Sequence, residues 1–83
     1  MEPYDFALGA EAVHWFASQS ARQRETLIQV FDGLARHPFA AGDYREAGHF
    51  GRAFEVTLSE DMIVTWWADH AAKEVRIVRL ERV

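Results

Sequence analysis

The hydrophobic period of the sequence changes at Pro38, and this change constrains the fold more than any other feature. Before Pro38, apolar residues recur at the spacing of one helix face: Leu27, Val30, Phe31 and Leu34. After it, apolar and polar residues alternate as they do in half-buried strands, for example at Phe54, Val56 and Leu58. Because proline disfavours the helical conformation of the residue before it, the helix must end here. The sequence therefore predicts a helical segment followed by a run of strands.

The same patterns set the expected elements. A first strand is predicted from Tyr4 to Leu8, and two helices over residues 10–19 and from Ser20, a suitable cap, to about residue 36. Strong strands are predicted over residues 52–58, 62–69 and 74–83, and a weak one over residues 44–50. The predicted order, β-α-α-β-β-β, is that of an α+β two-layer sandwich in which a helical hairpin packs on a mainly antiparallel sheet.

Length and composition allow one domain and exclude several classes of protein. The chain has 83 residues, which suits a single domain over residues 1–83, and its 49% hydrophobic content argues against disorder. It has no cysteine, which excludes disulfides and thiolate metal sites and fits a reducing cytoplasm. We see no signal peptide, and no apolar run reaches the roughly 20 residues that span a bilayer. We therefore expect a cytoplasmic protein without a membrane partner.

Charge and motif content exclude further functions. The net charge is −4 and no basic stripe is present, so we expect no direct sequence-specific DNA binding. The histidines lack the spacing of metal ligands, and no glycine-rich phosphate loop occurs. We therefore expect neither a metal nor a cofactor.

Four segments resemble those of a known family. The predicted hairpin closes with Leu34-Ala35-Arg36-His37-Pro38, and the strands carry Gly51-Arg52-Ala53-Phe54-Glu55-Val56, Ile63-Val64-Thr65-Trp66-Trp67-Ala68-Asp69-His70 and Lys73-Glu74-Val75-Arg76-Ile77-Val78. In this order the chain resembles the RelE/ParE superfamily, the toxins of bacterial type II toxin–antitoxin (plasmid stabilisation) systems. The resemblance implies a toxin that a cognate antitoxin neutralises by laying a helix or strand on its surface. RelE-like members cut messenger RNA in the ribosome, and ParE-like members poison DNA gyrase.

Most residues that carry RelE activity are not matched. RelE-like members use basic side chains on the middle strands, an arginine near the last strand, and often a tyrosine or histidine in a C-terminal tail. Here the matching strand positions hold Glu55, Thr57 and Ile63. Arg82 matches the arginine, and no tail follows Val83. We therefore predict a toxin that acts mainly by binding its target, which the resemblance gives as DNA gyrase or the ribosome.

Two alternatives stay open. The first is a metal-independent, ribosome-dependent endoribonuclease of RelE type that uses His49, Arg52 and Arg82. Such cleavage needs an acid, a base and cations for the charge on phosphorus, and His49 and Arg52 lie close together around Gly51. The second alternative is a non-toxic interaction module with the same fold.

The adjacent tryptophans predict a partner surface. Trp66 and Trp67 point to opposite faces of their strand, so only one can pack beneath the helices. The other would lie on the opposite sheet face, where a large aromatic side chain can anchor an interface. Strict alternation along the last strand places Arg76 and Arg82 on one face. The predicted partner-binding residues are Ile63, Thr65, Trp67 and Arg76, and we expect them to contact the antitoxin or a second copy in a homodimer.

Overall fold

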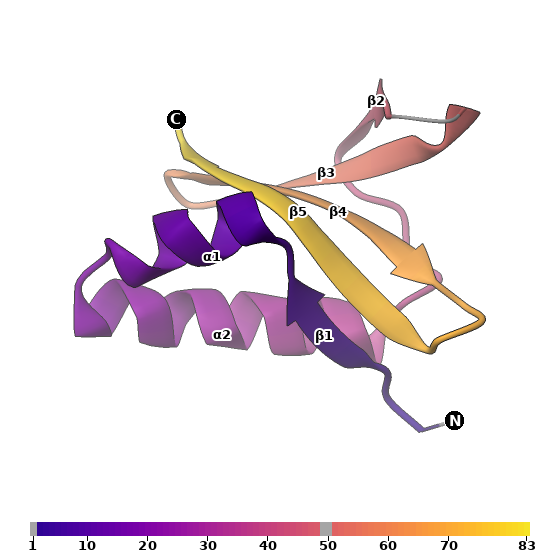
Figure 1. Cartoon of the computed structure of the whole chain (residues 1–83), viewed down its shortest axis with the longest axis horizontal. Helices are drawn as coiled ribbons and strands as arrows, with labels where there is room; N and C mark the ends of the chain where they lie inside the picture. Colours follow the sequence, from indigo (N-terminus) through magenta and orange to yellow (C-terminus); the bar gives the residue numbers. More distant parts are fainter. Residues whose placement is uncertain (1, 49–50) are drawn as a thin grey trace.

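The computed structural model describes residues 2–48 and 51–83 and shows two helices packed on one face of a five-stranded sheet (Figure 1). The elements are β1 (Asp5–Leu8), α1 (Ala10–Ala17), α2 (Ala21–Arg36), β2 (Tyr44–Ala47), β3 (Ala53–Ser59), β4 (Met62–Asp69) and β5 (Glu74–Arg82). The predicted α+β two-layer sandwich is confirmed. The weak strand candidate forms β2, so the order β-α-α-β-β-β-β has one strand more than the predicted order.

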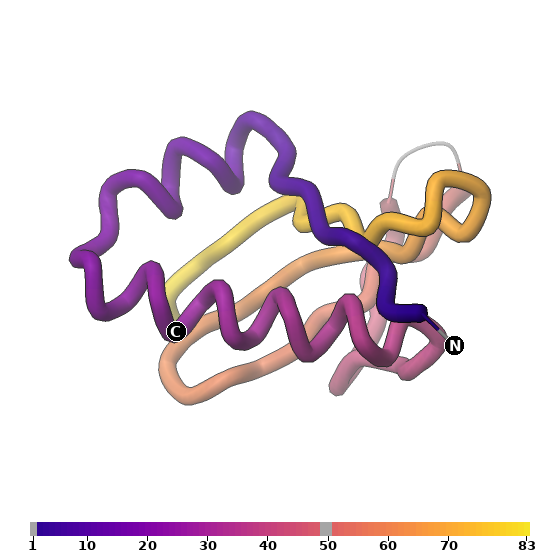
Figure 2. The backbone as a smooth tube through the Cα atoms, turned by 90° about the horizontal axis from the view of Figure 1, so that it is seen from below, coloured from indigo at the N-terminus to yellow at the C-terminus, as the bar shows by residue number. Residues whose placement is uncertain are grey.

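The sheet has the strand order β1-β5-β4-β3-β2. β1 runs parallel to β5, whereas the other neighbouring strands are antiparallel. The chain leaves β1 through the two helices and returns along an antiparallel meander. The first and last strands, β1 and β5, pair with each other in the sheet, and the helices pack against both (Figures 1 and 2).

The boundaries of the longer helix follow from local chemistry. α2 begins after Ser20, whose hydroxyl accepts a hydrogen bond from the Gln23 N–H at 3.2 Å. It ends at Arg36, because Pro38 disfavours a helical conformation at the residue before it. α1 and α2 lie next to each other on the same face of the sheet (Figure 2). Within residues 2–48 and 51–83, no helix is long and apolar enough to cross a membrane.

The main core lies between the helices and the sheet. Phe31 and Leu27 of α2 pack there against Trp66 and Ile77 of the sheet. Trp66 is therefore the tryptophan beneath the helices, and its indole N–H donates to the Thr57 hydroxyl at 2.9 Å. Because a buried indole N–H needs an acceptor, this hydrogen bond allows the ring to be fully enclosed.

A β-bulge interrupts β5. Thr65 pairs with Arg79, but the next residue of β4, Trp66, pairs with Ile77. Val78 is therefore an extra residue on β5, and it shifts the alternation of every side chain that follows it.

The bulge overturns the prediction that Arg76 and Arg82 share one face. Arg82 turns to the helix side, where its guanidinium donates to Gln19 Oε1 at 2.8 Å. Arg76 pairs in register with Trp67 on the opposite face. The sequence prediction failed because it assumed strict alternation through β5.

Candidate partner-binding face and adjoining cleft

The sheet face opposite the helices (Figure 1), which we refer to as the open face, carries four of the residues singled out from the sequence: Ile63, Thr65, Trp67 and Arg76. By strand register it presents Tyr44 and Glu46 from β2, Val56 and Leu58 from β3, Ile63, Thr65 and Trp67 from β4, and Arg76 and Arg79 from β5. Neither helix covers this face, so its own side chains determine what it can bind.

A charged bridge crosses the open face. The Arg79 guanidinium donates to Glu46 Oε1 on β2 at 2.6 Å and to Glu81 Oε1 at 2.5 Å. Its Nη2 also lies 3.4 Å from the Thr65 hydroxyl. The hydrogen bonds to Glu46 and then to Glu81 raise the pKa of Arg79 above its usual value. The bridge thereby joins β5 to β2 across the two strands between them.

Thr65 lies beneath this bridge and is fully buried. Its neighbour on β3, Val56, is also buried. Thr65 was predicted to contact a partner, but it is not part of the accessible surface. Of the other predicted partner-binding residues, Ile63 and Trp67 are partly exposed and Arg76 is exposed.

Arginine side chains cover the ring of Trp67. The guanidinium carbon of Arg52 lies 3.7 Å from the ring centroid, and that of Arg76 lies 5.6 Å from it. Cations at these distances are attracted to the face of an indole ring. Arg76 also forms ion pairs with Asp69 at 3.2 Å and with Glu74 at 3.1 Å. The surface around Trp67 is therefore more polar than the apolar run of β4 suggests.

The Asp69 carboxylate anchors the turn that follows β4. It accepts a hydrogen bond from the Ala72 N–H at 3.0 Å. This hydrogen bond, together with the positive charges of Arg76 and Arg52, holds the pKa of Asp69 below its usual range, against the opposing effect of burial. Asp69 is therefore ionised at neutral pH and holds Arg76 beside Trp67.

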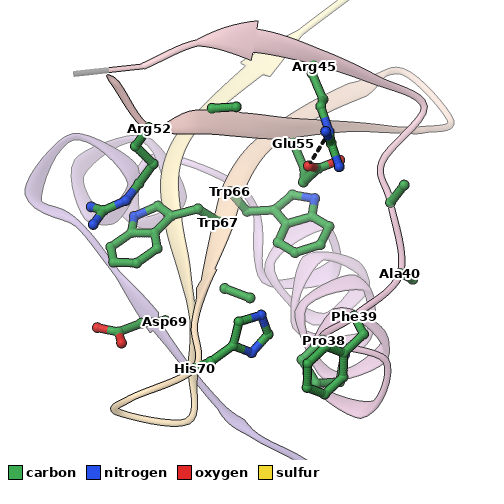
Figure 3. A pocket seen from close by; sticks show the side chains of 13 residues that line it. Pro38, Phe39, Ala40, Arg45, Arg52, Glu55, Trp66, Trp67, Asp69 and His70 are labelled. Carbon is green, nitrogen blue, oxygen red and sulfur yellow. Dashed lines mark hydrogen bonds and ion pairs between the residues drawn. The ribbon is translucent and has the colours of Figure 1, made fainter. Parts of the chain in front are cut away.

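A cleft of about 420 Å³ opens beside Trp67 (Figure 3). It forms where β3 and β4 diverge, because the register between them ends at the pair Glu55 and Trp66. Arg45 and Arg52 both line the cleft. The Arg45 Nε–H donates to the Glu55 carboxylate at 2.8 Å, so this arginine is already bound to a carboxylate.

An aromatic cluster forms another part of the cleft wall. The His70 ring stacks on Phe39, with centroids 4.4 Å apart and planes 6° from parallel. Its Nδ1 lies 2.9 Å from the Tyr4 hydroxyl. His70 was not among the predicted catalytic residues. The available signal was its position directly after the strand over residues 62–69, at the same end of the β3–β4 hairpin as Arg52.

The predicted catalytic residues do not come together. Arg52 lies at the cleft beside Trp67, whereas Arg82 pairs in register with Met62 at the other end of β4. Met62 and Trp67 are five residue steps apart along the strand, which is roughly 17 Å. Arg82 also lies on the helix side and is paired with Asp61 at 2.9 Å. His49 lies outside the described residues.

Most charged side chains of the sheet are paired with one another. Within residues 2–48 and 51–83, no group of three or more His, Cys, Asp or Glu side chains is arranged to hold a metal ion. Arg45, Arg76, Arg79 and Arg82 are all engaged with carboxylates. Stabilising the charge on a reacting phosphate requires cations directed at it, and these four are directed at carboxylates.

Comparison with known proteins finds similarity in structure but not in sequence. No protein-family model and no curated protein matches the sequence. Among solved structures, the toxin–antitoxin complex RelBE2 of Mycobacterium tuberculosis contains a chain with a TM-score of 0.79 at 17% identity, covering 100% of this chain and 94% of that one. The archaeal RelE–RelB complex of Pyrococcus horikoshii gives 0.74 at 14% identity, covering 98% and 96%. The Escherichia coli RelBE complex gives 0.64 at 11% identity, covering 96% of each chain.

These similarities define the class of fold. The chain has the fold of one chain in each of these RelBE complexes, and each match covers nearly the whole length of the two chains compared. This agrees with the fold that the RelE/ParE resemblance implied.

Proposed function

We propose that the chain is the toxin component of a bacterial type II toxin–antitoxin system and that a cognate antitoxin neutralises it. The observation that carries this proposal is the whole-length match to chains from three toxin–antitoxin complexes. The open face supports it, because β-sheet surfaces without a covering layer are suited to a partner that adds one.

We further propose that this toxin acts mainly by binding its cellular target, with DNA gyrase or the ribosome as candidates. The engagement of Arg45, Arg76, Arg79 and Arg82 with carboxylates supports a binding mode. Losing one preorganised donor typically lowers a catalytic rate by about 10²–10³. Several donors held by carboxylates therefore leave little capacity for RNA cleavage.

Induced expression tests the proposal. We expect growth arrest that is relieved when the small protein encoded next to the toxin gene is co-expressed. Separate assays of translation and of DNA supercoiling in the arrested cells then identify the target. If expression at high level leaves growth unchanged and the neighbouring protein does not bind, the non-toxic interaction module is the correct alternative.

Ribosome-dependent cleavage of messenger RNA is the second candidate. The observation that favours it is the cleft, where the exposed Arg52 and His70 lie on its walls. Primer extension on a translated message distinguishes the two functions. We expect no new cuts, whereas codon-positioned cuts that disappear in Arg52→Ala and persist in Arg82→Ala would establish the enzyme and place its site at the cleft.

A further inference from the structure

The end of the open face next to the β3–β4 turn is apolar and uncovered. Leu58 pairs in register with Ile63, and Tyr44 lies beside them on β2, opposite Val56. Tyr44 and Leu58 are each 49% exposed, and Ile63 is partly exposed. We refer to Tyr44, Leu58 and Ile63 as the apolar patch. Half-exposed apolar side chains that adjoin one another in this way are typical of an interaction site.

The patch has an acidic border. Four carboxylates lie at this end of the sheet and in its turn: Asp43, Glu60, Asp61 and Glu81. Two arginines lie among them, because Arg79 pairs with Glu81 and Arg82 pairs with Asp61. Carboxylates therefore outnumber the arginines around the patch.

The patch is separate from the cleft. Along β4, Ile63 and Trp67 lie at opposite ends of the open face, with Thr65 between them beneath the Arg79 bridge. The bridge therefore divides the face into the apolar patch and the Trp67 end. A segment can occupy the patch without entering the cleft.

We propose that the apolar patch binds a protein segment whose apolar side chains are flanked by lysine or arginine. This rests on the proposed function and assigns the segment to the antitoxin. The apolar side chains of the segment cover Leu58 and Ile63, and its cations complement the acidic border. The same border repels the phosphates of RNA, and it repels a second copy of the chain, which brings an identical negative border.

Two synthetic peptides of about 12 residues, the length of a short docking segment, test the chemistry. Both alternate leucine with a charged residue, which is lysine in one and glutamate in the other. We expect the lysine peptide to shift the amide NMR signals of Tyr44, Leu58 and Ile63. Its Kd should be at least about tenfold lower than that of the glutamate peptide, and its binding should weaken as salt screens the border.

A matched pair of variants locates the binding. Leu58→Ser should raise the Kd of the lysine peptide at least about tenfold, the effect expected of an interface anchor. Val13→Ser makes the same kind of change, from an exposed aliphatic side chain to serine, on α1. Val13 is 47% exposed, and its replacement should leave the Kd unchanged. Thermal unfolding of both variants verifies that they fold.

Several results would overturn the proposal. These are equal binding of the two peptides, shifts confined to the cleft or the helices, or a Leu58→Ser variant that binds normally. A concentration-dependent dimer that Leu58→Ser abolishes would assign the patch to a second copy instead.

Failure of this inference is distinguishable from failure of the proposed function. If a neutralising antitoxin binds Leu58→Ser and Val13→Ser equally well, the toxin function stands and the patch proposal fails. If expression never arrests growth but the lysine peptide binds at the patch, the patch binds such a segment and the toxin function fails.

Discussion

The Arg79 bridge gives the sharpest test of how the open face is held together. We consider Arg79→Met, which keeps an unbranched side chain over Thr65 but removes the guanidinium. Glu46 and Glu81 then lose their shared cation, and β2 loses its side-chain connection to β5. The change should therefore destabilise the sheet without opening the helix-side core.

The magnitude follows from exposure. Hydrogen bonds to charged groups contribute roughly 1.5–3 kcal/mol when shielded, and exposed ion pairs about 0.2–1 kcal/mol. The side chains of Arg79 and Glu46 are 32% and 34% exposed, which places their bond between these limits. We take about 1 kcal/mol for each of the two bonds, or about 2 kcal/mol in total. For a domain of this size, that lowers Tm by about 8–16 °C.

Urea unfolding followed by tryptophan fluorescence measures the free energy of unfolding. A double-mutant cycle of Arg79→Met with Glu46→Gln isolates the bond across the face, and we expect a coupling energy of about 1 kcal/mol. Arg82→Met is the matched control on the same strand. Its partner Asp61 is 58% exposed and its bond to Gln19 also lies at the surface, so the substitution should cost less than Arg79→Met, about 1 kcal/mol.

The reasoning is refuted if the coupling energy between Arg79 and Glu46 is below about 0.3 kcal/mol, the level of non-additivity expected for unconnected sites. It is also refuted if Arg82→Met destabilises the protein as much as Arg79→Met. In either case the bridge would not join β2 to β5 energetically.

Four further predictions concern single positions. Because the pKa of Asp69 is lowered from 3.8, its charge stabilises the fold above that pH, and this contribution is lost as pH falls through the folded-state pKa. Asp69→Asn should remove this part of the pH dependence of the free energy of unfolding, measured by urea titration. Ser20→Ala removes the α2 cap and should cost about 1 kcal/mol by the same assay. Trp66→Phe removes the donor to the Thr57 hydroxyl and leaves a gap in the core. Calorimetry should show that the free energy of unfolding falls by roughly 2 kcal/mol. Trp67→Ala should weaken antitoxin binding in calorimetric titrations at least about tenfold while the protein still unfolds cooperatively.

Elements with strong local signals were predictable. The strand predicted over residues 62–69 coincides with β4, because polar turns bound a continuous apolar run on both sides. α2 follows the prediction because Ser20 caps its start and Pro38 prevents its extension. β2 was harder, since the residues of Tyr44–Ala47 are mostly polar and its place is secured by pairing with β3.

The faces of β5 were not predictable from strict alternation. Its sequence carries apolar residues at Val75 and Ile77 and then at Val78 and Leu80, so the apolar parity changes within the strand. That change is the one signal of the bulge. Assuming strict alternation assigned Arg82 to the wrong face and left out the bridge formed by Arg79.

The candidate site was predictable only in part, for a related reason. The prediction that Trp67 lies opposite the helices with Ile63 needed only alternation along β4, which has no bulge of its own. Which cation covers which residue depends on contacts between different strands, such as Arg52 on Trp67 and Arg79 over Thr65. Contacts of this kind follow from register and curvature, which periodicity does not specify.

The bulge also determines where the open face can select a partner by charge. At the Trp67 end, two arginines are balanced by two carboxylates: Arg52 and Arg76 against Asp69 and Glu74. At the apolar patch, four carboxylates outnumber Arg79 and Arg82, even though the bulge brings Arg79 to this face. Electrostatic selection between partners should therefore act at the patch, whereas shape and stacking on Trp67 should decide what binds at the other end.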